Sequence, residues 1–238
     1  MKNKLHCGDN LKIMRSMSDC SVDLIATDPP YNSGQNYDDF DDRWDSDKQY
    51  LYFMELRLIE MHRILKDNGS FYLHCDASSS HYLKIMLDKI FSKKNFRREI
   101  IWALQRPSGF KTLANNWIRN HDIIFYYVKS STFKFNKQFE RYGDKEYPLH
   151  DVWSHIQSLQ SQGVSAREGT GYSTQKPITL YEKIISASSN PGDIVLDPFC
   201  GSGTTLVAAK LLQRFYIGID KNKNSIYLSK KRLQEIIL

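Results

Sequence analysis

The sequence predicts an α/β fold in which helices cover both faces of a mainly parallel sheet, a doubly wound arrangement with a small inserted segment. Along the 238-residue chain, short apolar runs alternate with helical patterns of about ten residues or more. Two of the apolar runs end directly in short loops, at Asp28 and at Asp197, as strands do at the carboxyl edge of such a sheet. Residues 130–172 interrupt the alternation, which marks them as the insert.

The expected strands are compact apolar runs of four to six residues. Residues 22–27 are typical, because they are mostly apolar and close at Asp-Pro-Pro, as a strand buried on both faces does. In chain order, the expected strands cover residues 22–27, 70–75, 99–103, 123–128, 193–196 and 215–219.

The expected helices show apolar residues at helical spacing. Within residues 48–65, Met54, Leu58 and Met61 recur at this spacing, and Asn68-Gly69 follows as a C-terminal stop. Pro177 stands in the first turn of a later helix, where its missing N–H costs nothing. In chain order, the expected helices cover residues 48–65, 78–91, 177–187, 204–212 and 222–236.

The composition is that of an ordinary globular domain, with 41% hydrophobic and 25% charged residues. The length suits one large α/β domain with a small insert and is too short for two full domains. Apolar runs such as residues 123–128 are far too short to cross a bilayer, and no apolar signal segment opens the chain. The four cysteines form no Cys-x-x-Cys pair, so we expect reduced thiols in a cytosolic protein, without a zinc site or disulfides.

Positive charge is concentrated in the middle of the chain. Residues 93–145 hold twelve Lys and Arg against four Asp and Glu, whereas the whole chain has a net charge of only +6. The same stretch is rich in Phe, Tyr and Trp, a combination that suits a phosphate backbone and exposed bases. A solvated basic face whose aromatic residues belong to the core explains the pattern equally well.

A glycine-rich loop, Asp197–Thr205 with the sequence DPFCGSGTT, joins an expected strand to an expected helix. Gly201 and Gly203 permit backbone angles and close approaches that a Cβ atom would block. Thr204 and Thr205 stand where the helix begins, and their hydroxyl and amide groups can hold a carboxylate there.

The strand after this helix ends at Asp220, and an acid in this position can accept both hydroxyls of a ribose. The loop is not a phosphate loop, since it lacks the Gly-Lys-Ser/Thr ending, and it lacks the third glycine of the dinucleotide pattern. The sequence therefore predicts a site for a nucleoside cofactor.

The other loop, Asp28-Pro29-Pro30-Tyr31, follows residues 22–27 and so stands at the carboxyl edge of the sheet. The two prolines fix the turn and remove two amide donors, which leaves carbonyl groups that can accept. The Asp28 side chain and the Pro29 carbonyl can accept both N–H groups of an exocyclic amine, while the base stacks on the Tyr31 ring.

The chemistry explains this choice of groups. An aromatic amine is a poor nucleophile, because its lone pair is delocalised into the ring. Two acceptors draw its N–H groups out of the ring plane and favour a pyramidal nitrogen that can attack an electrophilic methyl group in line. Asp28 orients the amine and accepts a proton late, so this direct transfer requires neither a covalent enzyme intermediate nor a metal ion, and we expect no metal site.

With these motifs the chain resembles the DNA amino-methyltransferases, which transfer a methyl group from S-adenosyl-L-methionine to adenine N6 or cytosine N4. Its order, with the base loop first and the cofactor loop last, is similar to their β group, a circular permutation of the Rossmann-like methyltransferase fold. The resemblance implies a catalytic half over residues 1–129, a target-recognition insert over 130–172 and a cofactor-binding half over 173–238. It implies the catalytic residues Asp28, Pro29, Pro30 and Tyr31. It implies the cofactor-binding residues Asp9, Lys176, Asp197, Phe199, Gly201, Ser202, Gly203, Thr204, Thr205 and Asp220.

Three shorter segments carry less of the resemblance. Gly8-Asp9 is similar to the motif whose acid faces the cofactor adenine, and Thr174-Gln175-Lys176-Pro177 to the motif that closes over the methionine part. His121-Asp122, before Ile123, is similar to the late strand of the catalytic half. Tyr172-Ser173 stands where the family often has His-Pro. His121 and His74 fit core or hydrogen-bonding positions better than catalytic ones. We interpret the acidic run at residues 38–47 as a solvated loop.

We therefore predict a site-specific methyltransferase that acts on adenine N6 in double-stranded DNA, because Asp-Pro-Pro-Tyr resembles the adenine form. A cytosine-N4 or RNA methyltransferase and a non-catalytic DNA-binding subunit are the alternatives. The target base must be flipped out of the duplex. Residues 105–120 and the insert would read the sequence, with Arg106, Lys111 and Arg119 as candidate contacts. We expect a monomer or homodimer in a prokaryotic cytoplasm, with a cognate restriction endonuclease as a candidate partner.

Overall fold

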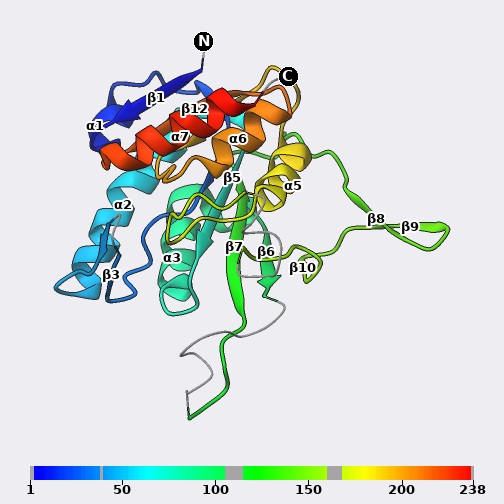
Figure 1. Ribbon diagram of the computed structural model, residues 1–238, viewed down its shortest axis with the longest axis horizontal. Helices are drawn as coiled ribbons and strands as arrows, with labels where there is room; N and C mark the ends of the chain where they lie inside the picture. Colours follow the sequence, from blue (N-terminus) through cyan, green and yellow to red (C-terminus); the bar gives the residue numbers. More distant parts are fainter. Residues whose placement is uncertain (1–2, 38–39, 105–114, 160–167, 237–238) are drawn as a thin grey trace.

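The computed structural model describes residues 3–37, 40–104, 115–159 and 168–236. An eight-stranded sheet runs through the centre of this part (Figure 1). In spatial order its strands are β1 (Lys4–Cys7), β12 (Phe215–Asp220), β11 (Ile194–Asp197), β2 (Val22–Thr27), β5 (Leu65–Cys75), β7 (His121–Val128), β6 (Phe96–Ala103) and β10 (Val152–Trp153). Strand β7 runs antiparallel to both of its neighbours, and every other pairing in the sheet is parallel.

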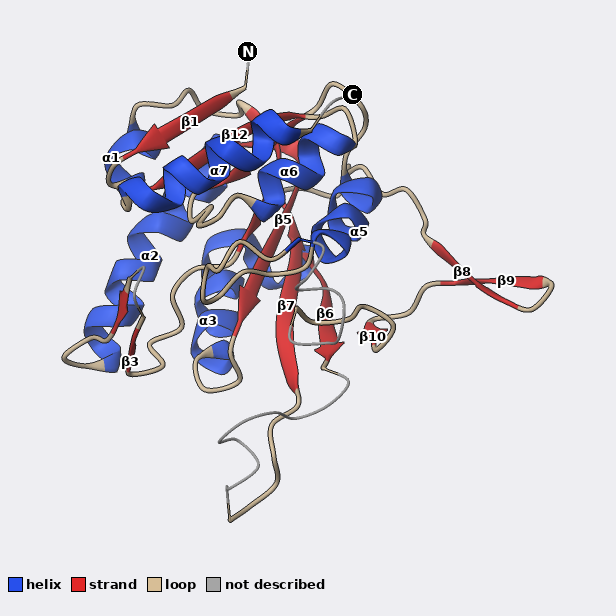
Figure 2. Cartoon of the chain, in the orientation of Figure 1, coloured by secondary structure: helices blue, strands red, loops and turns tan. Residues whose placement is uncertain are grey.

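Helices cover both faces of the sheet, which confirms the doubly wound fold (Figure 2). One face carries α1 (Asn10–Arg15), α2 (Asp47–Ile64) and α3 (Ser80–Leu87), and α3 continues through a π-helical turn at Asp88–Ser92 and a 3-10 turn at Lys93–Asn95. The other face carries α5 (Ile178–Ser188) and α6 (Thr204–Leu211), with α7 (Lys223–Glu235) packed against α6. No helix in the described part is long and apolar enough to cross a membrane.

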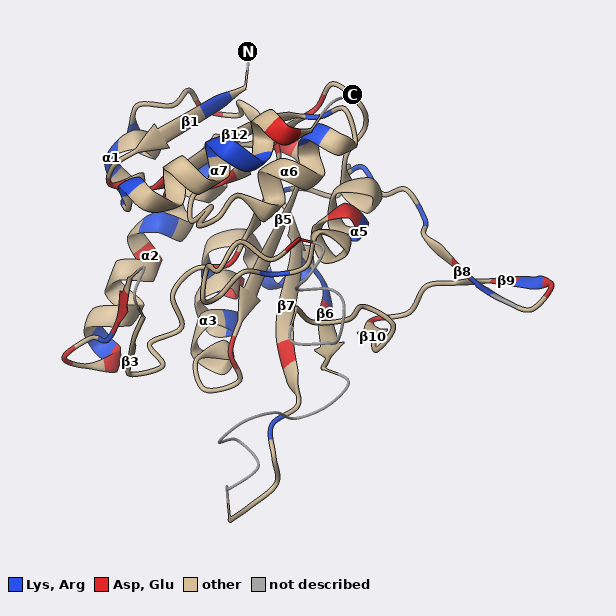
Figure 3. Cartoon of the chain, in the orientation of Figure 1, with Lys and Arg blue, Asp and Glu red and all other residues tan. Residues whose placement is uncertain are grey.

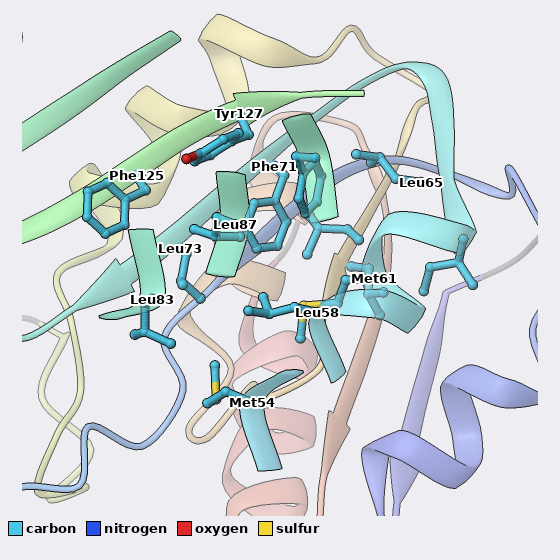
Figure 4. Close-up of a cluster of buried hydrophobic side chains, with 14 of the residues drawn as sticks. Met54, Leu58, Met61, Leu65, Phe71, Leu73, Leu83, Leu87, Phe125 and Tyr127 are labelled. Carbon is cyan, nitrogen blue, oxygen red and sulfur yellow. The ribbon is translucent and has the colours of Figure 1, made fainter. Parts of the chain in front are cut away.

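The larger core lies between α2, α3 and the sheet (Figure 4). Met54, Leu58 and Met61 occupy one side of α2, because residues three and four apart share a helix face. They pack with Phe71 of β5 and Leu83 of α3, and all five side chains are fully buried. Each contributes about 1.5–3 kcal/mol to the free energy of unfolding. This packing holds the central strands, and therefore the loops at their carboxyl ends, in fixed positions.

Several boundaries differ from the sequence prediction. The four residues of β1 and the six of α1 went unpredicted, since neither shows a clear apolar period. The chain turns from α2 into β5 at Leu65, so Asn68-Gly69 lies within the strand and is not a helix end. The pairing of β5 with β2 is irregular here, and a Cβ atom on Gly69 would lie 2.9 Å from the Asp23 carbonyl oxygen. Asn-Gly is therefore ambiguous in the sequence, because the same pair of residues occurs at helix ends and at irregular positions within strands.

Residues 130–172 contain more regular structure than their sequence indicates. A hairpin of β8 (Phe139–Tyr142) and β9 (Lys145–Pro148) projects away from the rest of the molecule (Figures 1 and 2). The chain then returns as β10, which pairs with β6 at the end of the central sheet. The Nε1 of Trp102 donates to the carbonyl of Ile156, at 2.9 Å, which ties the returning chain to β6. The segment thus supplies an edge strand of the domain as well as an excursion from it.

The interpretation of the acidic run as a solvated loop is wrong for Asp42. A small hairpin of β3 (Gln35–Asn36) and β4 (Asp41–Asp42) lies here, and the Asp42 side chain is buried. Its carboxylate accepts hydrogen bonds from the backbone N–H groups of Asn32, at 2.9 Å, and Ser33, at 3.0 Å. Asp42 therefore fixes the chain that follows the Asp-Pro-Pro-Tyr loop. Residues 38–39 of the run lie outside the described part.

Candidate active site

The structure brings the two predicted loops to one edge of the sheet. Strands β11 and β2 are parallel neighbours, with Val195 opposite Leu24 and Leu196 opposite Ile25. Both strands end at this edge, and a cavity of about 210 Å³ opens between their loops. Its lining includes most of the predicted site, namely Asp9, Asp28, Pro30, Lys176, Asp197, Phe199, Gly201, Ser202, Thr204, Thr205 and Asp220, together with residues such as Asn10, Phe53 and Arg57. Pro29, Tyr31 and Gly203 are not among its lining residues.

Asp197, the last residue of β11, anchors the glycine-rich loop to the end of β2. Its buried carboxylate accepts hydrogen bonds from the hydroxyl of Thr27, at 2.7 Å, from the hydroxyl of Thr205, at 2.6 Å, and from the Phe199 N–H, at 3.0 Å. Burial raises the pKa of Asp197 to about 6, although these hydrogen bonds oppose the shift. Because Thr27 is the last residue of β2, this one carboxylate joins the ends of both strands.

The two glycines of the loop have different neighbours. Gly201 has φ +48°, and a Cβ atom there would lie 3.2 Å from the Tyr172 ring at the cavity wall. Gly203 has φ +83°, and its Cβ atom would lie 2.6 Å from the Ser229 hydroxyl. Ser229 belongs to α7 and donates to the Gly201 carbonyl at 2.8 Å. Gly203 therefore permits the close packing of the loop against α7 and not the approach of a ligand.

Arg232 of α7 reaches under the same loop. Its buried guanidinium donates to the Ser202 carbonyl at 2.9 Å and to the Thr204 hydroxyl at 3.0 Å. The Thr205 hydroxyl is already engaged by Asp197. Within this loop, the groups best placed for a ligand are consequently the first-turn amides of α6, which have no intrahelical acceptor.

Asp220 closes the far side of the loop. Its carboxylate accepts from the Gly201 N–H at 3.0 Å and from the Asn222 N–H at 2.8 Å. The side chain stays half-buried at the cavity wall. Each carboxylate oxygen has a second lone pair, so Asp220 can also accept hydrogen bonds from a ligand hydroxyl.

A polar cluster beside Asp9 forms the next wall. Asp9 caps α1 by accepting from the Lys12 N–H at 3.0 Å, and Arg57 lies 3.3 Å from its other oxygen. Arg57 also donates to Asn10, whose amide in turn donates to the Pro198 carbonyl at 2.7 Å. Burial lowers the pKa of Arg57 to about 10, partly offset by the charge of Asp9.

Aromatic rings face this polar cluster. Phe53 lies 6.2 Å from Phe199 and 5.3 Å from Trp44 between ring centroids. The Arg57 guanidinium stands 3.5 Å above the centre of the Phe53 ring. Flat apolar walls with a few polar groups are typical of a site for a heteroaromatic ring.

The Asp-Pro-Pro-Tyr loop closes the other end of the cavity. The Tyr31 hydroxyl donates to one oxygen of Asp28, and Lys176 Nζ lies 2.6 Å from the other. Burial and the charge of Asp28 raise the pKa of Tyr31, so its hydroxyl is a donor at neutral pH. The Tyr50 hydroxyl donates to the Pro30 carbonyl at 3.0 Å and fixes the turn to α2.

A buried pair lies behind Tyr31. His74 at the end of β5 has its ring 6.1 Å from the Tyr31 ring, and its Nε2 is 3.1 Å from Asp122 Oδ2. Although burial opposes ionisation, the hydrogen bond and charge of His74 hold the pKa of Asp122 below its usual range. Arg119, a predicted DNA contact, forms an ion pair with Asp76 in the same region.

Sequence reasoning missed several residues of this site. Arg57 gave a signal, because it is a charged residue on the apolar face of α2 between Met54 and Met61. Trp44 and Phe53 gave none, since aromatic residues are common in cores. Tyr172 was noted only as standing where the family often has His-Pro. Lys176 was expected among the cofactor-binding residues; it lines the cavity, and its ammonium group lies on Asp28.

The basic middle segment divides into two groups. Lys129 and Lys134 are tied to the domain, since Lys129 binds the Leu65 carbonyl and Lys134 pairs with Asp193 at 2.7 Å. The exposed basic residues of the segment are Lys93, Lys94, Arg98, Lys137, Arg141 and Lys145. On the β8–β9 hairpin they alternate with acidic residues (Figure 3). Many of the aromatic residues, among them Trp102, Phe125, Tyr126 and Tyr127, are core, and Trp117 is 98% exposed. Arg106 and Lys111 lie outside the described residues.

Comparisons with known proteins agree with this arrangement. A family model described as DNA methylase matches residues 22–231. The type II methyltransferase M.HpaI of Haemophilus parainfluenzae is 36% identical over 98% of this chain and 74% of its own length. The DNA adenine methyltransferase YhdJ of Escherichia coli (strain K12) is 31% identical over 95% of this chain and 81% of its own length.

Solved structures show the same fold. The M1.HpyAVI–SAM complex has a TM-score of 0.68 and 26% identity, and the match covers 97% of this chain and 98% of the other. The cytosine-N4-specific PvuII DNA methyltransferase has a TM-score of 0.75 and 18% identity, over 100% of this chain and 89% of the other.

Proposed function

The chain belongs to the family of DNA methylases, and from this premise we propose that it transfers a methyl group from S-adenosyl-L-methionine to adenine N6 in a specific sequence of double-stranded DNA. The observation that carries the proposal is the shared cavity, which is lined by Asp28 at one end and by the Asp197–Thr205 loop at the other. A methyl donor and an amine acceptor must meet in line, and neighbouring parallel strands provide that meeting point.

The cavity residues fit the cofactor part by part. We assign the adenine ring to the aromatic wall of Phe53 and Phe199, the ribose hydroxyls to Asp220, and the methionine carboxylate to the first-turn amides of α6. When bound, S-adenosyl-L-methionine supplies an electrophilic methyl group on its sulfonium sulfur. Asp9, held by Arg57, completes the adenine end as an acceptor for its amine.

Asp28, Pro29 and Tyr31 act on the target base. The Asp28 carboxylate and the Pro29 carbonyl accept the two N–H groups of the amine, which favours a pyramidal nitrogen with an available lone pair. Tyr31 stacks on the base, a contact worth about 1–3 kcal/mol. As the N–C bond formed, the bond between sulfur and the methyl carbon would break and leave a neutral thioether. Asp28 would then accept the surplus proton of the nitrogen and pass it to solvent. The target reaches this position by flipping out of the duplex, at a cost of a few kcal/mol.

The exposed basic residues of the middle segment are our candidates for phosphate contacts. Residues 105–120 and 130–172 are our candidates for reading the DNA sequence. Relatives such as M.HpaI and M.HinfI of Haemophilus influenzae are type II methyltransferases. A cognate restriction endonuclease is the partner that this relationship favours for the present chain.

The test is to express the chain in cells that lack DNA methylation and to sequence their DNA by a single-molecule method. Nucleosides from DNA and RNA, incubated with the enzyme and labelled cofactor, are then analysed by mass spectrometry. N6-methyladenine in one DNA sequence context supports the proposal, and label on cytosine N4 or on RNA contradicts it. Asp28→Ala should bind cofactor normally yet lose turnover, and turnover that survives would refute the role of Asp28.

A further inference from the structure

Lys176 occupies the acceptor that the target amine needs. Its Nζ lies 2.6 Å from Asp28 Oδ2 and 3.0 Å from the Tyr31 hydroxyl, while that hydroxyl donates to Asp28 Oδ1. Both carboxylate oxygens are thus engaged by donors from the protein itself. The Lys176 and Asp28 side chains are only 13% and 16% exposed, so water does little to screen the pair.

An ammonium group and an aromatic amine compete at this position for electrostatic reasons. Both present N–H donors to the same carboxylate. When the amine accepts a methyl group, its nitrogen becomes positively charged, and a second cation on the same carboxylate would oppose this charge.

We propose, on the basis of the proposed function, that Lys176 holds the place of the target amine in the base-free enzyme and leaves Asp28 when the flipped base enters. In the base-free state it neutralises a partly buried carboxylate, which would otherwise be costly. Although burial opposes the charge, Asp28 and Asp122 raise the pKa of Lys176, so it remains an ammonium ion before the exchange.

The chain around Lys176 is suited to such an exchange. Lys176 precedes α5 and belongs to neither a helix nor a strand. The preceding Gln175 anchors the segment, since its side chain accepts from the Thr170 N–H at 3.0 Å and donates to the Glu168 carbonyl at 2.7 Å. The flexible lysine stem can therefore swing while the backbone stays in place.

The first experiment measures the pair without DNA, by thermal unfolding of the full chain. Lys176→Met and Asp28→Asn should each lower the Tm, on the order of 5–10 °C, because each leaves a partly buried charge unpaired. The double variant should lose clearly less than the sum of the two, since neither charge remains. Additive losses would show that the two groups do not interact and would overturn the proposal. This arm is independent of the substrate.

The second experiment measures base entry, with 2-aminopurine placed beside the target adenine of the sequence identified above. Lys176→Met removes the competitor, so the fluorescence that reports base extrusion should rise above that of the wild type. In Lys176→Arg, the guanidinium group can form a bidentate pair with the Asp28 carboxylate, so the 2-aminopurine fluorescence and the single-turnover rate should fall. Lys84→Met is the matched control, because it removes another lysine–aspartate pair, to Asp88 at 2.8 Å, outside the cavity.

The outcomes separate the two proposals. A fall in extrusion for Lys176→Met would mean that Lys176 helps to bind the base, and the placeholder role would be wrong. An unchanged signal in both Lys176 variants would equally overturn it. If no DNA or RNA base is methylated, the proposed function fails, while the pairing of Lys176 with Asp28 is still decided by the unfolding experiment.

Discussion

Gly203 offers a sharp test of how the glycine-rich loop is held. Replacing it by alanine has two costs. At φ +83°, an alanine backbone is destabilised by about 1–2 kcal/mol relative to glycine. The new methyl group would also lie 2.6 Å from the Ser229 hydroxyl and 3.1 Å from the Ser229 Cα, and relieving such overpacking costs about 1–3 kcal/mol. Gly203→Ala should therefore lower the free energy of unfolding by about 2–5 kcal/mol.

Gly192 provides the matched control. Its φ is +86°, almost that of Gly203, but a Cβ atom there would meet nothing within 4 Å. Gly192→Ala should consequently show the backbone cost alone, about 1–2 kcal/mol. Equilibrium urea unfolding at neutral pH measures both variants, and their difference isolates the contact with α7. Equal losses in the two variants would refute the packing argument, because only the backbone angle is common to both.

Three further predictions concern charged groups. Burial raises the pKa of Asp197 to about 6, so between pH 4 and 6 the native state keeps a proton that the unfolded chain releases. The free energy of unfolding should therefore fall by up to about 3 kcal/mol as the pH rises from 4 to 6. Urea titrations of wild type and Asp197→Asn should diverge in this window, and parallel curves would contradict the raised pKa. Asp23 is buried between Lys66 and Lys134, which lower its pKa despite the opposing effect of burial. Asp23→Asn should lower the free energy of unfolding by about 1–3 kcal/mol at neutral pH and by less as the pH falls below 4. A loss of the same size at pH 2.5 would argue against an ionic origin. Arg57→Met should raise the Kd for the cofactor about tenfold, because Asp9 and Asn10 lose their common hydrogen-bond donor. Titration calorimetry measures this Kd, and an unchanged value would exclude Arg57 from the binding site.

Much of the site could be predicted because its signals are local in the sequence. Val22–Thr27 and Ile194–Asp197 each end in a loop with an aspartate and a proline, and parallel strands place such loops at one edge. The sequence could not indicate which hydroxyl groups stay available. Arg232 engages the Thr204 hydroxyl only after α7 has packed against the loop, whereas Asp197 engages the Thr205 hydroxyl from within the loop itself.

The harder features depend on distant parts of the chain. Strand β1 has four residues and no apolar period, and its pairing with β12, more than 200 residues later, is what makes it a strand. Lys176 and Asp28 are separated by 148 positions, so no local pattern could place one on the other. Asp42 looked like one of several solvated aspartates until its contacts with the Asn32 and Ser33 amides were visible.

The ladder between β11 and β2 has a consequence for inhibitor design. Backbone hydrogen bonds hold adjacent strands about 4.8 Å apart, and β11 and β2 are neighbours in the same eight-stranded sheet. Under the proposed function, a bisubstrate compound, in which a nucleoside is tethered to a purine amine, would thus encounter two half-sites on neighbouring strands of one sheet. A short, stiff tether should outperform a long flexible one, because little conformational freedom would be lost on binding.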